Sequence, residues 1–223
     1  MIENENAPYS QSESMNDNSN YYTHVREDVL AHVPQEARRV LSVGCGEGRT
    51  EAQLIARGVE VTGIELNPEA AKAASLAGIK IICGDATACS AQLAGGPPFD
   101  CLIYADVLEH IQDPESVLRE HVKFLAPGGT VIVSVPNFRH HFVFRQLFLA
   151  GHVRYRDAGL FDRTHVRITT RRMVEEWFAT VGLTTTKIDF ALNRRRDRYL
   201  SWVTFGLFRE FLYPQVIVIG IRR

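Results

Sequence analysis

The stretch that decides the fold is RRVLSVGCGEGRT, residues 38–50. The apolar run at residues 40–43 is typical of a buried strand, and Gly44, Gly46 and Gly48 follow it directly. A helical pattern begins after Gly48. Backbone N–H groups at such a turn face outward, and glycine lets a ligand approach the backbone closely. The stretch predicts a strand, a ligand-binding glycine turn and a helix N-terminus, although a glycine-rich turn alone is a weak signal.

The bulk properties of the chain favour an ordinary globular protein. Its 223 residues suffice for one domain with a sizeable core, and a net charge of −1 gives no overall attraction to nucleic acid. The four cysteines form no C-x-x-C pair, and the histidines show no metal-ligand spacing, so we expect no metal. With no signal-peptide pattern and no apolar run long enough to span a membrane, we expect a cytoplasmic protein.

Strands and helices alternate along the chain with short links. Strands are predicted at residues 40–43, 59–66, 79–83, 99–105, 130–135, 183–192 and 215–221, and helices at 21–33, 52–56, 68–77, 87–93, 114–126 and 171–181. Residues 1–20 are predicted to be a disordered tail and residues 21–223 one domain. The alternation predicts an α/β fold, a mainly parallel sheet with helices on both faces. Ligands bind such sheets at the carboxyl ends of the strands.

Three features follow three successive predicted strands. After the glycine turn comes Glu65, whose carboxylate can accept hydrogen bonds from both hydroxyls of a ribose. Asp85 and Ala86 follow the third strand, where they would meet the rim of an adenine. Arg49 stands where the NAD fingerprint needs a third glycine to approach a pyrophosphate. The pattern therefore favours S-adenosylmethionine, an adenosine-containing ligand without phosphate.

Longer motifs carry a family resemblance. VLSVGCGEG (40–48), GIEL (63–66), GDA (84–86), YADVLEHIQDPESVLRE (104–120) and LAPGGTVIVSVPN (125–137) resemble the class I S-adenosylmethionine-dependent methyltransferases. The most similar group contains ubiquinone-biosynthesis O-methyltransferases, MetW-type proteins and polysaccharide-locus methyltransferases. The resemblance runs from about residue 21 to residue 182. It implies a Rossmann-like seven-stranded sheet whose last strand is antiparallel.

The resemblance also implies roles for individual residues. The implied cofactor-binding residues are Tyr22, Gly44, Cys45, Gly46, Gly48, Glu65, Leu66, Asp85, Ala86 and Ala105. The glycine turn would follow the methionine end of S-adenosylmethionine, and Ala105 with Asp106 would lie below the methyl donor. Tyr22 would belong to a lid over the ligand, or to a helix that packs on the sheet edge. The chain departs from the family at Ser42, where an acidic residue near the cofactor's ammonium group is usual.

Two histidines and Asp106 are the candidate catalytic residues. His110 follows the fourth strand and would act as general base or hold its loop through a backbone carbonyl. His165 and Asp162 lie in GLFDRTHVRITT, residues 159–170, and would face the acceptor or form a capping network before Thr170. A base would remove the proton of an acceptor hydroxyl.

Two insertions interrupt the alternation, at residues 137–167 and 193–213. The first, with interleaved aromatic and basic residues, is expected to cover the acceptor site. The second is expected to form a homodimer interface, a lid or a peripheral membrane helix. The predicted function is methyl transfer to a small molecule or glycan, at a hydroxyl oxygen. The alternatives are an N- or C-methyltransferase and a non-catalytic protein that acts through a partner.

Overall fold

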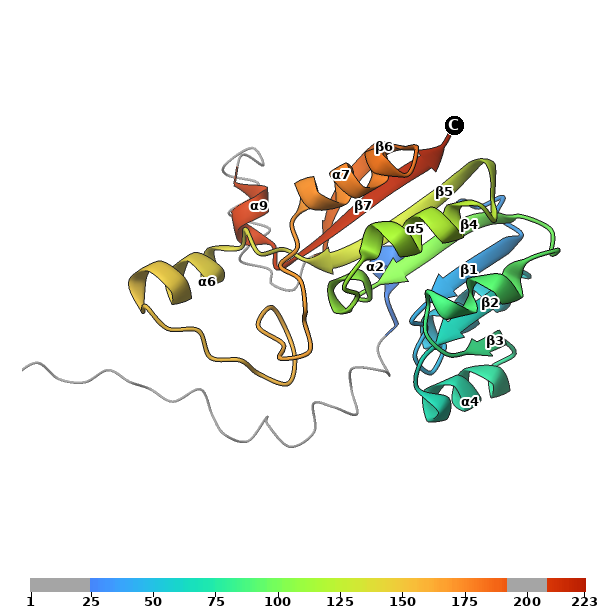
Figure 1. Cartoon of the computed structure of the whole chain (residues 1–223), viewed down its shortest axis with the longest axis horizontal. Helices are drawn as coiled ribbons and strands as arrows, with labels where there is room; N and C mark the ends of the chain where they lie inside the picture. The colour runs from blue at the N-terminus through green and yellow to red at the C-terminus, as the bar shows by residue number, and fades with distance from the viewer. Residues whose placement is uncertain (1–24, 192–207) are drawn as a thin grey trace, which may run out of the picture.

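A computed structural model of the protein describes residues 25–191 and 208–223. Its centre is a seven-stranded sheet with the order β3-β2-β1-β4-β5-β7-β6 (Figure 1). The strands are β1 (Arg39–Val43), β2 (Glu60–Glu65), β3 (Lys80–Cys83), β4 (Phe99–Ala105), β5 (Leu125–Pro136), β6 (Leu183–Ala191) and β7 (Gln215–Arg222). Strands β1 to β5 pair in parallel, and β7 runs antiparallel to both β5 and β6. The predicted fold, including the antiparallel last strand, is confirmed.

Helices cover both faces of the sheet. One face carries α2 (Glu27–Leu30), α3 (Arg49–Ile55) and α4 (Pro68–Leu76), and the other carries the 3-10 helix η2 (Ala88–Leu93), α5 (Pro114–Val122) and α7 (Arg171–Thr180). Strand residues of alternate orientation divide the core accordingly. Leu41 and Tyr104 belong to the cluster under α5 and α7, whereas Val40 and Ile103 belong to the cluster under α2 and α3. Burial on both faces explains why the central strands β1, β4 and β7 are largely apolar, whereas the edge strand β6 is not.

Two helix starts follow from their capping residues. The side chain of Asn67 accepts hydrogen bonds from the backbone N–H groups of Glu69 and Ala70, and Pro68 occupies the first turn of α4. Asp113 caps α5 in the same way, through the N–H of Ser116. These caps confirm the predicted starts. They also fix the points at which the chain leaves the carboxyl edge of the sheet.

The sequence interpretation is wrong at Pro127-Gly128-Gly129. The three residues were expected to end a helix before a strand at 130–135, but α5 ends at Val122 and β5 begins at Leu125. Leu125 is buried and pairs with Phe99, and regular pairing with β4 resumes at Thr130, so the glycines lie in an irregularity within the bounds of β5. The register shifts between Phe99 and Cys101, which accommodates this irregular start.

The first predicted helix is shorter than expected. Of residues 21–33, only Glu27–Leu30 form α2 within the part that the structure describes. Tyr22, the tail at 1–20 and most of the second insertion lie outside the described residues. In the first insertion, α6 (His141–Phe144) and the π-helix η4 (Arg145–Leu149) lie away from the sheet (Figure 1). No helix in residues 25–191 or 208–223 has the length and apolar character needed to cross a membrane.

Candidate active site

The glycine turn lies between β1 and α3. Gly44, Gly46 and Gly48 have φ angles of +68°, +56° and +76°, values that residues other than glycine rarely adopt. The N–H of Gly44 donates to the carbonyl of Ile64 at 2.7 Å, which ties the turn to β2. A Cβ at Gly44 would lie 2.4 Å from Cγ2 of Val107. The turn therefore needs glycine for its backbone shape and for its close packing against the loop after β4.

Glu65 is buried at the end of β2 and braces the turn. Its Oε2 accepts the N–H of Gly46 at 2.8 Å, and its Oε1 accepts the N–H of Asn67 at 2.8 Å. Each carboxylate oxygen keeps acceptor capacity for a further hydrogen bond, as a pair of ribose hydroxyls requires. The predicted juxtaposition of Glu65 and the glycine turn is thus what the structure contains.

A first cavity of about 540 Å³ opens beside Glu65, within the usual range for small-molecule sites. Its lining includes seven predicted site residues, namely Gly44, Glu65, Leu66, Asp85, Ala86, Asp106 and His110. Leu66 is 68% exposed at its mouth. Cys45, Gly46, Gly48 and Ala105 do not line this cavity. They lie in or directly after the elements that shape it.

The loop after β3, which lines the first cavity, is held by two sets of polar contacts. The carboxylate of Asp85 accepts the N–H groups of Thr87 and Ala88, at 2.8 and 3.2 Å. The carbonyl of Ala86 lies 3.0 Å from Nε2 of His121, whose Nδ1 lies 2.8 Å from the hydroxyl of Tyr104. His121 is buried, and burial lowers its pKa. It has a structural role that its sequence context does not predict.

A second cavity, of about 820 Å³, lies on the other side of Asp106. Among its lining residues are Arg26, Asp28, Glu109, Leu160, His165 and Gln215. Asp106 and Asp162 line both cavities. Two ligands, one in each cavity, would therefore meet at these two carboxylates.

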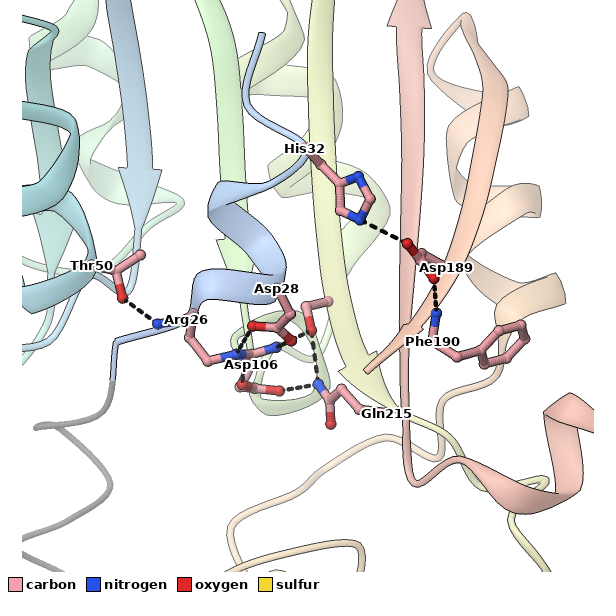
Figure 2. Close-up of polar contacts among 9 residues, drawn as sticks. Arg26, Asp28, His32, Thr50, Asp106, Asp189, Phe190 and Gln215 are labelled. Carbon is pink, nitrogen blue, oxygen red and sulfur yellow. Dashed lines mark hydrogen bonds and ion pairs between the residues drawn. The ribbon is translucent and has the colours of Figure 1, made fainter. Parts of the chain in front are cut away.

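Asp106 is held by a polar network that Figure 2 shows. Its carboxylate pairs with the guanidinium of Arg26 and accepts a hydrogen bond from the side-chain amide of Gln215. Both donors also reach the hydroxyl of Ser134, at 2.7 and 2.9 Å. Asp106 has a φ of +57°, and burial raises the pKa of its carboxyl group. The network joins the ends of β4, β5 and β7 to the segment before α2 at the wall between the cavities.

A second polar group surrounds Glu109, in the short 3-10 helix η3 (Leu108–His110). Glu109 is 0% exposed, and neither carboxylate oxygen has a hydrogen-bond partner among the described residues. Burial, and then the charge of Asp106, raises its pKa well above the usual range. Oε1 of Glu109 lies 4.0 Å from Nε2 of His165. The backbone carbonyl of Glu109 accepts the N–H groups of Val166 and Arg167, which brings the first insertion to this helix.

His110 lies beside this pair and completes a compact cluster. Its ring is 4.8 Å from that of His165, and the ligand-type atoms of Glu109, His110 and His165 all lie within 4.8 Å of one another. The chain spacing alone does not predict this cluster, because His165 comes from a distant insertion. Nδ1 of His110 lies 3.2 Å from the carbonyl of Thr164, the contact expected if His110 holds its loop. Asp162 accepts the N–H and hydroxyl of Thr164, as in a capping turn.

The chain matches a known protein family. A family model described as "Methyltransferase domain" matches residues 17–188, which is more than half of the chain. The chain belongs to this methyltransferase family. The family resemblance predicted from the motifs is confirmed.

Curated relatives of the chain are ubiquinone biosynthesis O-methyltransferases. The one from Caulobacter sp. (strain K31) is 34% identical over 125 residues, which cover 51% of this chain and 50% of the relative. The one from Xylella fastidiosa (strain 9a5c) is 37% identical over 118 residues, with 51% and 48% covered. The chain thus spans about half the length of the curated relatives that it matches.

Solved structures share the fold at low sequence identity. A SAM-dependent methyltransferase from Archaeoglobus fulgidus has a TM-score of 0.66 at 16% identity, covering 92% of this chain and 94% of that one. A possible histamine N-methyltransferase from Thermotoga maritima has a TM-score of 0.63 at 19% identity, with 91% and 89% covered. These similarities concern the methyltransferase fold alone.

Sequence reasoning missed Arg26, Glu109 and Gln215. Arg26 precedes a very short helix, and Gln215 begins the last strand, so nothing in their local sequence indicates a contact with Asp106. Glu109 stands in the quoted motif beside His110, but only the fold reveals that its carboxylate is buried.

Proposed function

We propose that the protein transfers a methyl group from S-adenosylmethionine to a hydroxyl oxygen of a small molecule or glycan. The observation that supports this most is the pair of cavities that share Asp106 and Asp162. Methyl transfer is an in-line displacement, so it needs two ligands whose reacting ends meet. One cavity has the features of an adenosyl site, and the other is large enough for an acceptor.

The residues of the first cavity fit S-adenosylmethionine. The carboxylate of Glu65 keeps acceptor capacity for the ribose hydroxyls, and the glycine turn offers a surface without side chains. Asp85 and Ala86 would flank the adenine. When bound, the cofactor supplies an activated methyl group on a sulfonium. The protein's part is to hold the donor and acceptor in line and to exclude water, an effect worth up to roughly 7–11 kcal/mol for ideal alignment.

The second cavity would hold the acceptor. His165 lines it, whereas His110 lines the first cavity and already contacts Thr164. We therefore assign the general base to His165. An imidazole in this position would take the proton from the acceptor hydroxyl as the methyl group is transferred, a contribution of about 10²–10⁴-fold. The relatives named as O-methyltransferases support oxygen as the methylated atom.

The test is methyl transfer from methyl-labelled S-adenosylmethionine to panels of phenols, sugars, lipid-linked sugars and amines. We expect labelled product with a hydroxyl compound, and a loss of rate of about 100-fold or more in His165→Asn with little change in S-adenosylhomocysteine binding. His141→Asn, at an exposed histidine that lines neither cavity, is the matched control.

Two results would contradict the proposal. Labelled product with amines alone would replace it by N-methylation. Cofactor binding without product on any panel, together with a stable complex with another protein, would support the non-catalytic alternative. The panels containing lipid-linked sugars also test whether the acceptor lies at a membrane, which is one reading of residues 193–213.

A further inference from the structure

The helix that follows the glycine turn contains a buried carboxylate that sequence reasoning did not assign. Glu51 is the third residue of α3 and is 4% exposed. Its Oε1 accepts a hydrogen bond from the buried hydroxyl of Ser42 at 2.6 Å. Within residues 25–191 and 208–223, no lysine, arginine or histidine contributes to the pKa shift of its carboxyl group. The carboxylate is therefore buried with a hydroxyl as its side-chain partner and no described counter-charge.

The surroundings of Glu51 make this arrangement unfavourable without a ligand. Burial raises the pKa of Glu51, and the negative charge of Glu65 raises it further. Cys45 lies in the turn, and the pKa of its thiol is raised by burial and then by both carboxylates. A buried carboxylate costs free energy unless it is paired. A cation bound at the turn would offset the excess negative charge.

The position of Glu65 indicates which end of a bound S-adenosylmethionine would lie near Glu51. Glu65, Asp85 and Ala86 lie on the β2 and β3 side, so the adenosine end belongs there. The methionine end must then extend along the glycine turn toward β1, α3 and β4. Three carboxylates lie on that side, those of Glu47, Glu51 and Asp106. Asp106 already pairs with Arg26 and Gln215, and Glu47 pairs with Arg49, which leaves Glu51.

We propose that Glu51 supplies the negative charge that attracts the ammonium group of the cofactor's methionine end, with Ser42 holding its carboxylate in place. The inference rests on the proposed function, since it assumes a cofactor that ends in an amino acid. Ser42, in β1, carries no charge. Glu51, in α3, supplies a negative charge from the other side of the turn. It is a cofactor-positioning residue and takes no part in the chemistry.

The test compares two ligands that differ at the methionine end. S-adenosylhomocysteine carries the ammonium and carboxylate groups, whereas methylthioadenosine has the same adenosine and sulfur without them. Calorimetric titration of both ligands into the wild type and into Glu51→Gln separates a loss of charge from a distortion of the turn. We expect Glu51→Gln to bind S-adenosylhomocysteine about tenfold to a hundredfold more weakly. Its affinity for methylthioadenosine should change by no more than about twofold.

A double variant provides the rescue. Because Oγ of Ser42 lies 2.6 Å from Oε1 of Glu51, a carboxylate placed at residue 42 would occupy nearly the same site. Ser42→Asp combined with Glu51→Gln should regain most of the lost affinity for S-adenosylhomocysteine. Thermal unfolding of each variant shows whether it is folded. If Glu51→Gln does not fold, the wild type alone still tests the proposal with S-adenosylhomocysteine that lacks its amino group, which should bind at least about tenfold more weakly.

The outcomes distinguish this inference from the proposed function. If the wild type binds neither ligand, the proposed function fails, and the inference fails with it. If the wild type binds S-adenosylhomocysteine but Glu51→Gln weakens both ligands equally, the proposed function stands and Glu51 only shapes the turn. Unchanged affinities in Glu51→Gln, or equal binding of the deaminated ligand by the wild type, would also overturn the inference.

Discussion

Gly44 is a residue at which the turn and the loop after β4 pack closely together. In Gly44→Ala, the new Cβ would lie 2.4 Å from Cγ2 of Val107 at a φ of +68°. We expect a loss of about 2–4 kcal/mol in the free energy of unfolding, from backbone strain and overpacking together. Urea unfolding measures this loss.

Gly58→Ala is the control for Gly44→Ala. Gly58 has a φ of +84°, but nothing lies within 4 Å of its Cβ position. This variant should lose only the strain contribution, about 1 kcal/mol. Equal losses in the two variants would show that the contact with Val107 does not matter.

Arg26 is the cation that pairs with Asp106 at the wall between the cavities. Arg26→Met would leave a largely buried carboxylate with the side-chain amide of Gln215 as its remaining partner among the described residues. We expect a loss of about 2 kcal/mol, between the values for exposed and fully buried pairs. The loss should shrink as the pH falls, because protonation removes the uncompensated charge and burial already raises the pKa of Asp106.

The partner variant separates the charge from the packing of Arg26. Combining Arg26→Met with Asp106→Asn removes both charges, so the double variant should be more stable at pH 7 than Arg26→Met alone. Chemical unfolding at pH 5 and pH 7 gives both comparisons. Arg26 also pairs with Asp28, which both variants leave without this partner. A loss independent of pH, with no recovery in the double variant, would therefore mean that the pair with Asp106 does not contribute.

At the scale of elements, α7 and β7 meet where a glycine makes room for an aromatic ring. A Cβ at Gly220 would lie 2.6 and 2.7 Å from the ring carbons Cδ2 and Cε2 of Phe178. We expect Gly220→Ala to cost about 1–3 kcal/mol through overpacking. Adding Phe178→Leu should make the combined loss smaller than the sum of the two single losses, as unfolding in urea would show. Additive losses would contradict a direct contact.

The sequence predicted elements best where local chemistry marks their ends. Asn67-Pro68 and Asp113-Pro114 cap their helices as expected, and β4 has the predicted bounds of residues 99–105. It failed at Pro127-Gly128-Gly129, because Leu125 already pairs with Phe99 and these residues form an irregularity before regular pairing with β4 resumes at Thr130. Neither the helix-free course of most of the first insertion nor its contact with η3 has a local signal.

The candidate site was predictable to the extent that it follows the strand ends. Glu65, Asp85 and Asp106 each end or follow a parallel strand, so the topology alone brings them together. The Glu109–His165 pair and the Arg26–Asp106 pair join residues that are 56 and 80 positions apart. Such contacts depend on how the first insertion and the segment before α2 fold back, which a single sequence does not encode locally.

For the whole molecule, buried histidines make stability depend on pH. Burial lowers the pKa of His121 below its ordinary value of 6.5, so the unfolded chain binds a proton more readily than the folded one. The contribution of neutral His121 to the free energy of unfolding is then fully present above pH 6.5. It is lost as the pH falls toward the folded-state pKa, by up to about 1.4 kcal/mol per pH unit. His121→Asn should be less stable at pH 7.5 but less sensitive to acid below pH 6.5.

His141→Asn is the control for that comparison, since His141 is exposed. It removes the contact of Nδ1 with the carbonyl of Phe211, so its unfolding free energy should differ from that of the wild type by the same amount at each pH from 5 to 7.5. The same acid sensitivity in His121→Asn and the wild type would show that His121 is not the group responsible.

The account of the molecule depends most on its adenosyl site, so the decisive measurement is calorimetric titration of S-adenosylhomocysteine into the wild type and into Glu65→Ala. We expect micromolar binding by the wild type. Glu65→Ala should lose about 1–3 kcal/mol of binding free energy, the scale for buried hydrogen-bonding groups left without their partner. Absence of binding by the folded wild type, or equal binding by both proteins, would contradict the assignment of the glycine turn and Glu65 as the cofactor site.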